Sequence, residues 1–241
     1  MKPHRQILIL AFSAASAVLA LAQANPVERR GQLSGEVALV QAVTGASTRD
    51  ASRVVVWLAP MDAVQQVRVT ERHYRLLQHN KRFEPGLLVV PVGSVVDFPN
   101  ADPWFHNVFS LYRGKRFDLG LYQAGAQRSV KFDRVGPSYL FCNIHPQMTG
   151  VVLAVDSELF AVTDKSGRYS IEGVAPGKYV FHVWYDNAAP ESLEALARPV
   201  NIEAETRALP AISIKVTKQT QTEHKNKYGQ DYDPDTLKTD Y

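Results

Sequence analysis

The sequence predicts an all-β protein made of two small β-sandwiches, and three observations support this fold class. Short runs rich in Val, Leu, Ile, Phe and Tyr recur along the chain, as strands do in sandwiches with turns every 8–12 residues or so. Glycine and proline, 14 of each, gather between these runs and mark turns. A helical pattern is plausible only over 191–197.

The first group of strands extends to residue 156. A loop with Thr44, Gly45 and Ser47 separates the first two strands, and residues 72–79 fit either a short strand or a helical turn. The segment NIHPQMT separates the last two strands. The expected strands are 33–41, 53–60, two within 87–99 around the turn at Pro91-Val92-Gly93, 108–112, 117–122, 129–132, 138–142 and 150–156.

A second group of strands follows. The turn composition of Asp164-Lys165-Ser166-Gly167 and the dipeptide Pro176-Gly177 separate its members. The run KYVFHVWY alternates in polarity as a half-buried strand does. The expected strands are 160–163, 169–171, 178–185, 199–202 and 211–216.

The two ends of the chain differ from this pattern. Lys2 and Arg5 precede an apolar run and an A-x-A pattern at 22–24, so residues 1–24 are expected to be a cleaved signal peptide of a periplasmic or otherwise exported protein. An uncleaved anchor is the alternative. After signal removal we expect no integral membrane segment, since no second apolar run has that length. The polar tail, 217–241, is expected to be disordered or draped over the surface.

Charge and cysteine content restrict the function. A net charge of +3 does not suggest a nucleic-acid-binding protein, which usually has a strongly basic face. Cys142 is the single cysteine. Because exported cysteines usually pair, this thiol is a buried free thiol, an intermolecular bridge or a metal ligand.

The segment FCNIHPQMTG places three metal-ligand types close together. Cys142, His145 and Met148 follow the spacing C-x2-H-x2-M, and His106 offers a fourth ligand upstream. Two histidines, one cysteine and a weak axial methionine form the donor set of blue-copper sites. Zinc seldom takes methionine, and calcium prefers oxygen donors. The sequence therefore predicts one mononuclear type 1 copper.

Two segments resemble the cupredoxin, or blue-copper, family. GLLVVPVGSVVDFPNADPWFHNVFS is similar to the strand pair that ends in the family's first histidine ligand, and SVKFDRVGPSYLFCNIHPQMTGVVLAV is similar to its closing hairpin, with an amicyanin-like metal loop. The resemblance covers about 83–155. It implies a Greek-key sandwich whose copper ligands are His106, Cys142, His145 and Met148. The chain is also similar to exported proteins named for methylamine utilisation.

The resemblance extends to groups around the ligands. It implies that Asn107 ties the two ligand loops together through the backbone near Cys142 or Asn143. One edge of the His145 ring is expected to approach the surface. An apolar collar around it would suit brief docking of a redox protein partner, and it consists of Trp104, Phe105, Ile144 and Pro146.

The remaining strands resemble a carboxypeptidase-regulatory-like, or transthyretin-like (Ig-like), sandwich. The opening Gly35-Glu36-Val37, the strand VVVWL and the motif Pro176-Gly177-x-Tyr179 carry this likeness. We expect this sandwich to be discontinuous, 30–70 plus 159–216, with a cupredoxin domain at 71–158 inserted in it. Two tandem domains are the alternative.

The resemblance implies single-electron transfer between periplasmic redox partners. No acid–base group lies beside the predicted ligands, so we expect a carrier and not an enzyme. Two alternatives stay open: a periplasmic copper-binding protein for copper delivery or buffering, and a non-redox structural or binding module.

Overall fold

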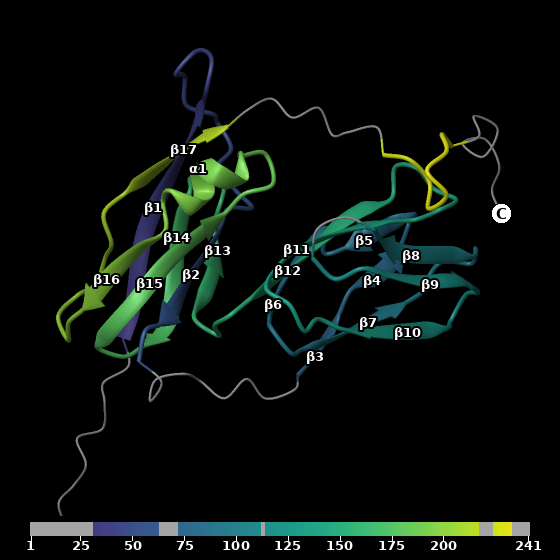
Figure 1. Cartoon of the computed structure of the whole chain (residues 1–241), viewed down its shortest axis with the longest axis horizontal. Coiled ribbons are helices and arrows are strands. Elements are labelled where there is room, and N and C mark those ends of the chain that lie inside the picture. The colour runs from purple at the N-terminus through teal and green to yellow at the C-terminus, as the bar shows by residue number, and fades with distance from the viewer. Residues whose placement is uncertain (1–30, 63–71, 112–113, 217–223, 233–241) are drawn as a thin grey trace, which may run out of the picture.

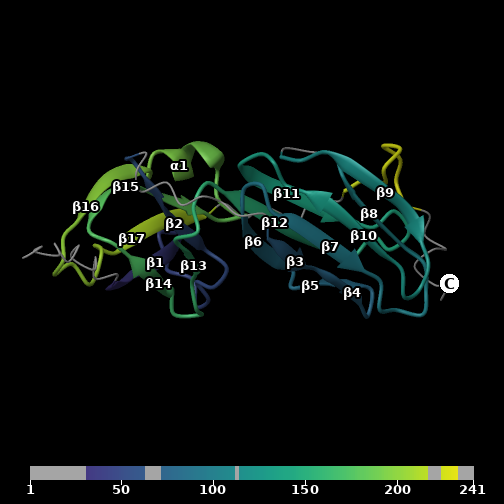
Figure 2. The same cartoon turned by 90° about the horizontal axis from the view of Figure 1, so that it is seen from below.

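The computed structural model describes residues 31–62, 72–111, 114–216 and 224–232, so the predicted signal peptide lies outside the described residues. Almost all regular structure is β, and two β-rich units lie side by side along the long axis (Figure 1). Figure 2 gives the same arrangement from below. The predicted all-β class is confirmed. The predicted helix is present but shorter, as α1 (Pro190–Glu194).

The first unit is a discontinuous sandwich of two sheets, ordered β14-β1-β17 and β13-β2-β15-β16. Strand β1 lies antiparallel to β14 and parallel to β17, and β2 lies antiparallel to β13 and β15. Strands from both ends of the chain therefore share each sheet, and the second unit is inserted between them. The strands are β1 (Gly31–Gln41), β2 (Val55–Pro60), β13 (Phe160–Val162), β14 (Arg168–Val174), β15 (Gly177–Trp184), β16 (Arg198–Ile202) and β17 (Ile212–Val216).

The inserted unit has a five-stranded sheet, β6-β12-β11-β8-β9, a three-stranded sheet, β10-β7-β3, and the hairpin β4-β5. The undecided segment 72–79 forms two short strands, and the strand β5 was not predicted. The strands are β3 (His73–Arg75), β4 (Leu77–His79), β5 (Arg82–Glu84), β6 (Leu87–Pro91), β7 (Val95–Pro99), β8 (His106–Ser110), β9 (Phe117–Tyr122), β10 (Gln127–Lys131), β11 (Gly136–Phe141) and β12 (Thr149–Val155).

Strand β12 contributes to the hydrophobic cores of both units. Val151, Leu153 and Val155 pack into the core of the sandwich, whereas Val152 and Ala154 pack into the core of the inserted unit. Side chains alternate between the two faces of a strand, so a strand that is buried on both faces must be apolar throughout. This explains the uninterrupted run GVVLAV and shows that the two units share a packed boundary.

Polar contacts also join the two units. The indole N–H of Trp57 in β2 donates to Oδ1 of Asp156 over 2.8 Å, and the Ser157 hydroxyl donates to the carbonyl of Leu58 over 2.6 Å. Asp156 and Ser157 both lie where the chain leaves β12. The end of the inserted unit is therefore fixed to the sandwich by hydrogen bonds as well as by apolar packing.

The polar tail is expected to be disordered or draped over the surface, and residues 224–232 fit the second alternative. This segment lies on the inserted unit, on the right of Figure 1. Hydrogen bonds and ring contacts hold it there instead of a buried apolar stripe, which is why an apolar pattern could not reveal it. The rest of the predicted tail, 217–223 and 233–241, lies outside the described residues.

Candidate metal centre

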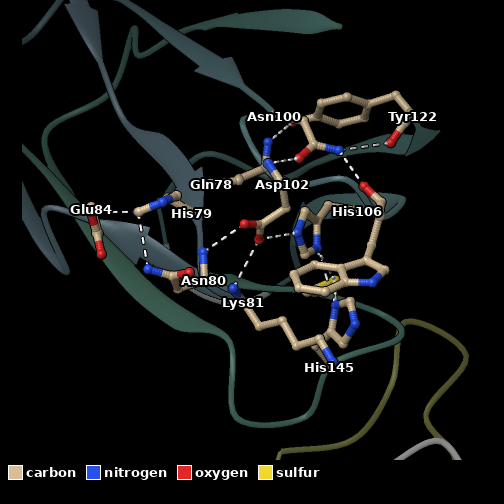
Figure 3. A network of polar contacts seen from close by, with 12 residues as sticks. Gln78, His79, Asn80, Lys81, Glu84, Asn100, Asp102, His106, Tyr122 and His145 are labelled. Atoms are coloured by element: carbon tan, nitrogen blue, oxygen red, sulfur yellow. Dashed lines mark hydrogen bonds and ion pairs between the residues drawn. The ribbon is translucent and has the colours of Figure 1, made fainter. Parts of the chain in front are cut away.

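The structure brings three predicted ligands to one point. Nδ1 of His106 lies 3.1 Å from Nδ1 of His145, and the sulfur of Cys142 lies 3.9 Å and 3.6 Å from these two nitrogens. All three donor atoms lie within 4.8 Å of one another. Figure 3 shows the two imidazole rings meeting at this point.

Local pairing explains why these distant residues meet. His106 begins β8, Cys142 follows the last residue of β11, and Phe109 of β8 pairs with Phe141 of β11. The loop between β11 and β12 is closed by its own backbone: Cys142 N–H donates to the carbonyl of Met148, and Met148 N–H donates to the carbonyl of His145. The C-x2-H-x2-M spacing thus forms a tight turn that faces the start of β8.

The donor set fits a soft or borderline metal ion. His106 and Cys142 are fully buried and His145 is 2% exposed. A trigonal site with metal–nitrogen bonds of about 2.0 Å and metal–sulfur bonds of about 2.3 Å needs donor atoms about 3.5–3.7 Å apart, which the three separations bracket. Nδ1 of His106 and Nδ1 of His145 lie 3.1 Å apart, and two lone pairs at this distance repel each other. A cation or a proton between the two nitrogens removes this repulsion.

A carboxylate fixes the orientation of the first histidine. Nε2 of His106 lies 2.8 Å from Oδ2 of Asp102, and both groups are buried. Because the carboxylate only accepts, Nε2 carries the proton and Nδ1 keeps its lone pair for a metal. Burial lowers the pKa of His106, although the Asp102 carboxylate opposes this shift, so the neutral, metal-binding form is favoured.

Asp102 itself is held by its surroundings. Burial alone would raise its pKa, but the backbone N–H of Lys81, the His106 ring and the backbone N–H of Asn80 together lower it. Its own N–H donates to the Oδ1 of Asn100, whose amide nitrogen donates to the carbonyls of Trp104 and Tyr122. Figure 3 shows this network behind the His106 ring. The sequence does not single out Asp102, because it lies four residues before His106 in a segment of turn composition, where aspartate is common.

The environment of the thiol is mixed. Burial raises the pKa of Cys142, while the backbone N–H groups of Asn107, Ile144 and His145 donate to the sulfur and lower it. These donors point at the atom that would carry the negative charge of a metal-bound thiolate.

His145 departs from the prediction that its ring edge approaches the surface. The residue is buried, and burial together with the nearby charges of His106 and Lys81 lowers its pKa to about 4. Lys81 reaches over the Trp104 ring, with Nζ 4.8 Å from the ring centroid. Nε2 of His145 has no hydrogen-bond partner among the described residues. The Nε2 edge of the ring is therefore buried and does not approach the surface.

The other predicted site residues have mixed outcomes. Met148 is fully buried beside Cys142 in the core of the inserted unit. The amide nitrogen of Asn107 donates to Asp118 and to the carbonyl of Gly120 in β9, the strand that neighbours β8 in the sheet. Its backbone N–H donates to the Cys142 sulfur and so links β8 to the ligand loop.

The predicted docking collar is partly accessible. Phe105 is 47% exposed, and Trp104, Ile144 and Pro146 are half-buried. Asn143, the other predicted neighbour of the ligands, accepts a hydrogen bond from the backbone N–H of Lys227 in the C-terminal segment.

Comparison with known proteins gives only distant likenesses. No family model matches the chain, and no curated protein matches its sequence. Among solved structures it is similar to a purple cupredoxin from Nitrosopumilus maritimus, with 24% identity, 35% of this chain and 100% of that chain covered, and a TM-score of 0.31. A mutant of amicyanin in its reduced form has 21% identity, 42% and 98% coverage, and a TM-score of 0.33.

A third similar structure is larger. It is a copper-containing nitrite reductase from Thermus scotoductus, with 23% identity and a TM-score of 0.34; the match covers 40% of this chain and 27% of that one. In the part of the present chain that the structure describes, no helix is long and apolar enough to cross a membrane.

Proposed function

We propose that this chain is an exported type 1 copper protein that carries single electrons between redox protein partners. The observation that carries the proposal is the convergence of two imidazole nitrogens and one thiol sulfur, 3.1–3.9 Å apart, in a buried position. This is the donor combination of blue-copper electron-transfer sites.

Each ligand has a separate role in this proposal. His106 and His145 would bind copper through Nδ1 and Cys142 through its thiolate, and the Met148 thioether would be a weaker fourth donor. Copper bound there supplies a one-electron change between Cu(II) and Cu(I). Asp102 holds the His106 ring and its tautomer, and the backbone N–H groups that point at Cys142 stabilise the negative sulfur.

Burial of the ligands favours an electron carrier over the alternatives. Ligands that are at most 2% exposed hold an ion away from competing molecules, whereas delivery of copper needs a ligand that another protein can approach. The same burial leaves the donor atoms inaccessible to a substrate, so we propose a carrier and not an enzyme. A non-redox module would not need two buried histidines that face each other beside a buried thiol.

Phe105 gives the proposed docking face its most accessible apolar side chain. It precedes His106 directly, so a partner that packs on this ring comes close to a ligand without entering the site. Export of the chain, through the predicted signal peptide, is part of the proposal.

The test is copper loading of the purified full chain. We expect an intense visible absorption band from the bond between Cys142 sulfur and Cu(II), and a reversible one-electron wave in voltammetry. Cys142→Ser should lose the band, and His73→Ala, which removes an exposed histidine outside the centre, should keep it. A colourless wild-type protein would rule the proposal out, and a coloured one that quickly loses copper to a chelator would favour delivery.

A further inference from the structure

The segment 224–232, here called the C-terminal clamp, contacts the ligand loop 142–148 along its length. The Tyr232 hydroxyl donates to the carbonyl of Cys142 over 2.9 Å, and Nε2 of His224 lies 2.6 Å from the carbonyl oxygen of Pro146. The His224 ring also packs on Phe141, with centroids 4.2 Å apart. The clamp therefore contacts the loop at Cys142 and again at Pro146.

A third contact lies between these two. The backbone N–H of Lys227 donates to Oδ1 of Asn143 over 3.0 Å, and its Nζ pairs with Asp118 of β9 at 2.9 Å. Asp118 also accepts from the Asn107 side chain. The clamp thus connects the ligand loop to the strand that neighbours β8, which carries the other histidine.

The clamp has a defined conformation of its own. Oδ1 of Asn226 accepts the backbone N–H groups of Tyr228 and Gln230, and Asn226 N–H donates to the Gln230 carbonyl. The Tyr232 hydroxyl lies 3.2 Å from Nδ1 of His224, so the two contact residues also support each other. A preorganised turn holds its target more firmly than a flexible chain does, because less entropy is lost on contact.

The contacts of the clamp lie at a ligand residue or directly beside one, so they restrict the positions of the ligands. Cys142 is itself a ligand, Asn143 follows it, and Pro146 follows His145. Within the loop, two backbone–backbone hydrogen bonds of 2.9 Å and 3.2 Å close the turn, and the N–H groups of Ile144 and His145 donate to the Cys142 sulfur. A metal site needs its ligands fixed to within about 0.5 Å, so contacts from outside the loop add to this internal support.

We propose that the C-terminal clamp holds the ligand loop in its metal-binding conformation, with Tyr232 and His224 as positioning residues. This inference rests on the proposed copper function for its purpose, but the positioning itself is a property of the metal-free chain. The proposal assigns a positioning role to residues 224–232, which lie within the polar tail.

The first test uses the metal-free full chain. Tyr232→Phe removes only the hydroxyl, and Tyr228→Phe is the matched control, because Tyr228 is 70% exposed and its described ring contact is with Lys227 of the clamp. Loss of one hydrogen bond should speed amide hydrogen exchange of Cys142 and Met148 about five-fold. Amides of β12 beyond the loop, such as that of Val152, should exchange as in the wild type.

The second test uses the copper-loaded chain. Tyr232→Phe should release copper to a Cu(I) chelator about five-fold faster than wild type and Tyr228→Phe, and His224→Ala/Tyr232→Phe faster still. Unchanged exchange and unchanged release in both the single and the double variant would overturn the clamp while leaving the copper function intact. If the wild type takes up no copper, the proposed function fails and the exchange measurement alone decides on the clamp.

Discussion

Replacement of Asp102 by asparagine tests how the centre is preorganised. Oδ2 of Asp102 accepts from His106 Nε2 at 2.8 Å and from the Lys81 backbone N–H at 2.9 Å, and Oδ1 accepts from the Asn80 backbone N–H at 2.7 Å. Asparagine has nearly the same shape, but it has no charge and replaces one acceptor by an N–H2 donor. If the N–H2 group replaces Oδ1, the Asn80 N–H faces another donor; if it replaces Oδ2, both His106 Nε2 and the Lys81 N–H do.

The histidine is the donor that can adapt. If the amide N–H2 faces His106, the ring gains a hydrogen bond by moving its proton from Nε2 to Nδ1, and Nδ1 is the atom that must bind the metal. Changes at such ligand-orienting partners typically lower metal affinity about 10–100-fold, which corresponds to about 1.4–2.7 kcal/mol. We therefore expect Asp102→Asn to lower copper affinity by this amount.

Competition titration against a copper chelator measures the affinity, and the ¹⁵N shifts of His106 in the metal-free protein report the tautomer. Asp133→Asn is the control, because it removes an exposed carboxylate that pairs with Lys115 in the same unit. Wild-type affinity together with an unchanged Nε2–H tautomer in Asp102→Asn would refute the reasoning.

The same carboxylate predicts a pH dependence. Because the pKa of Asp102 is lower in the folded chain than its ordinary value of 3.8, its ionised form stabilises the fold at higher pH. This contribution is present above the unfolded pKa and is lost as the pH falls through the folded pKa. In metal-free protein, the difference in unfolding free energy between wild type and Asp102→Asn should shrink when denaturant titrations are repeated below about pH 4.

Three further predictions concern the axial ligand and the sandwich. Met148→Gln should lower the reduction potential in voltammetry while the colour remains, and an unchanged potential would show that the sulfur is not axial. Gly35→Ala should destabilise the chain by about 1–3 kcal/mol in thermal unfolding, because a Cβ there collides with the buried Tyr169 ring; a neutral effect would contradict this packing. Trp57→Phe removes the hydrogen bond to Asp156 and should cost about 1 kcal/mol by the same assay, a loss that Asp156→Ala, which removes the acceptor, should largely reproduce if the contact is responsible.

The sequence was sufficient to predict most of the strands and the set of donor residues. Apolar runs between turn residues predicted most strands. A strand that is buried on both faces, such as β12, needs apolar residues at nearly every position, so its sequence is easily identified. The spacing of Cys142, His145 and Met148 predicted a shared site because thiol, imidazole and thioether seldom occur so close together by chance. Strand pairing then brings His106 to the same place.

What the sequence could not predict depends on distant contacts. Asp102 lies in a segment that reads as a turn, where aspartate is common, so only the fold reveals it as a partner of His106. His145 lies in a short loop between two strands, a position that suggests exposure, and its burial depends on the tertiary structure around the loop. The clamp binds backbone carbonyls of the loop, which every sequence offers, so no side-chain pattern marks its target.

The split sandwich constrains the order in which a newly made chain can reach its final form. Val54, just before β2, bonds to the hydroxyl of Thr163, which lies 109 positions later. The apolar side chains of β1 and β2 therefore stay without their partner strands until the inserted unit has been synthesised. Long-range pairing of this kind is slow and leaves the chain prone to aggregation. The strands of the inserted unit, β3 to β12, lie between residues 73 and 155, so all of them are synthesised before strands β13 to β17 of the sandwich.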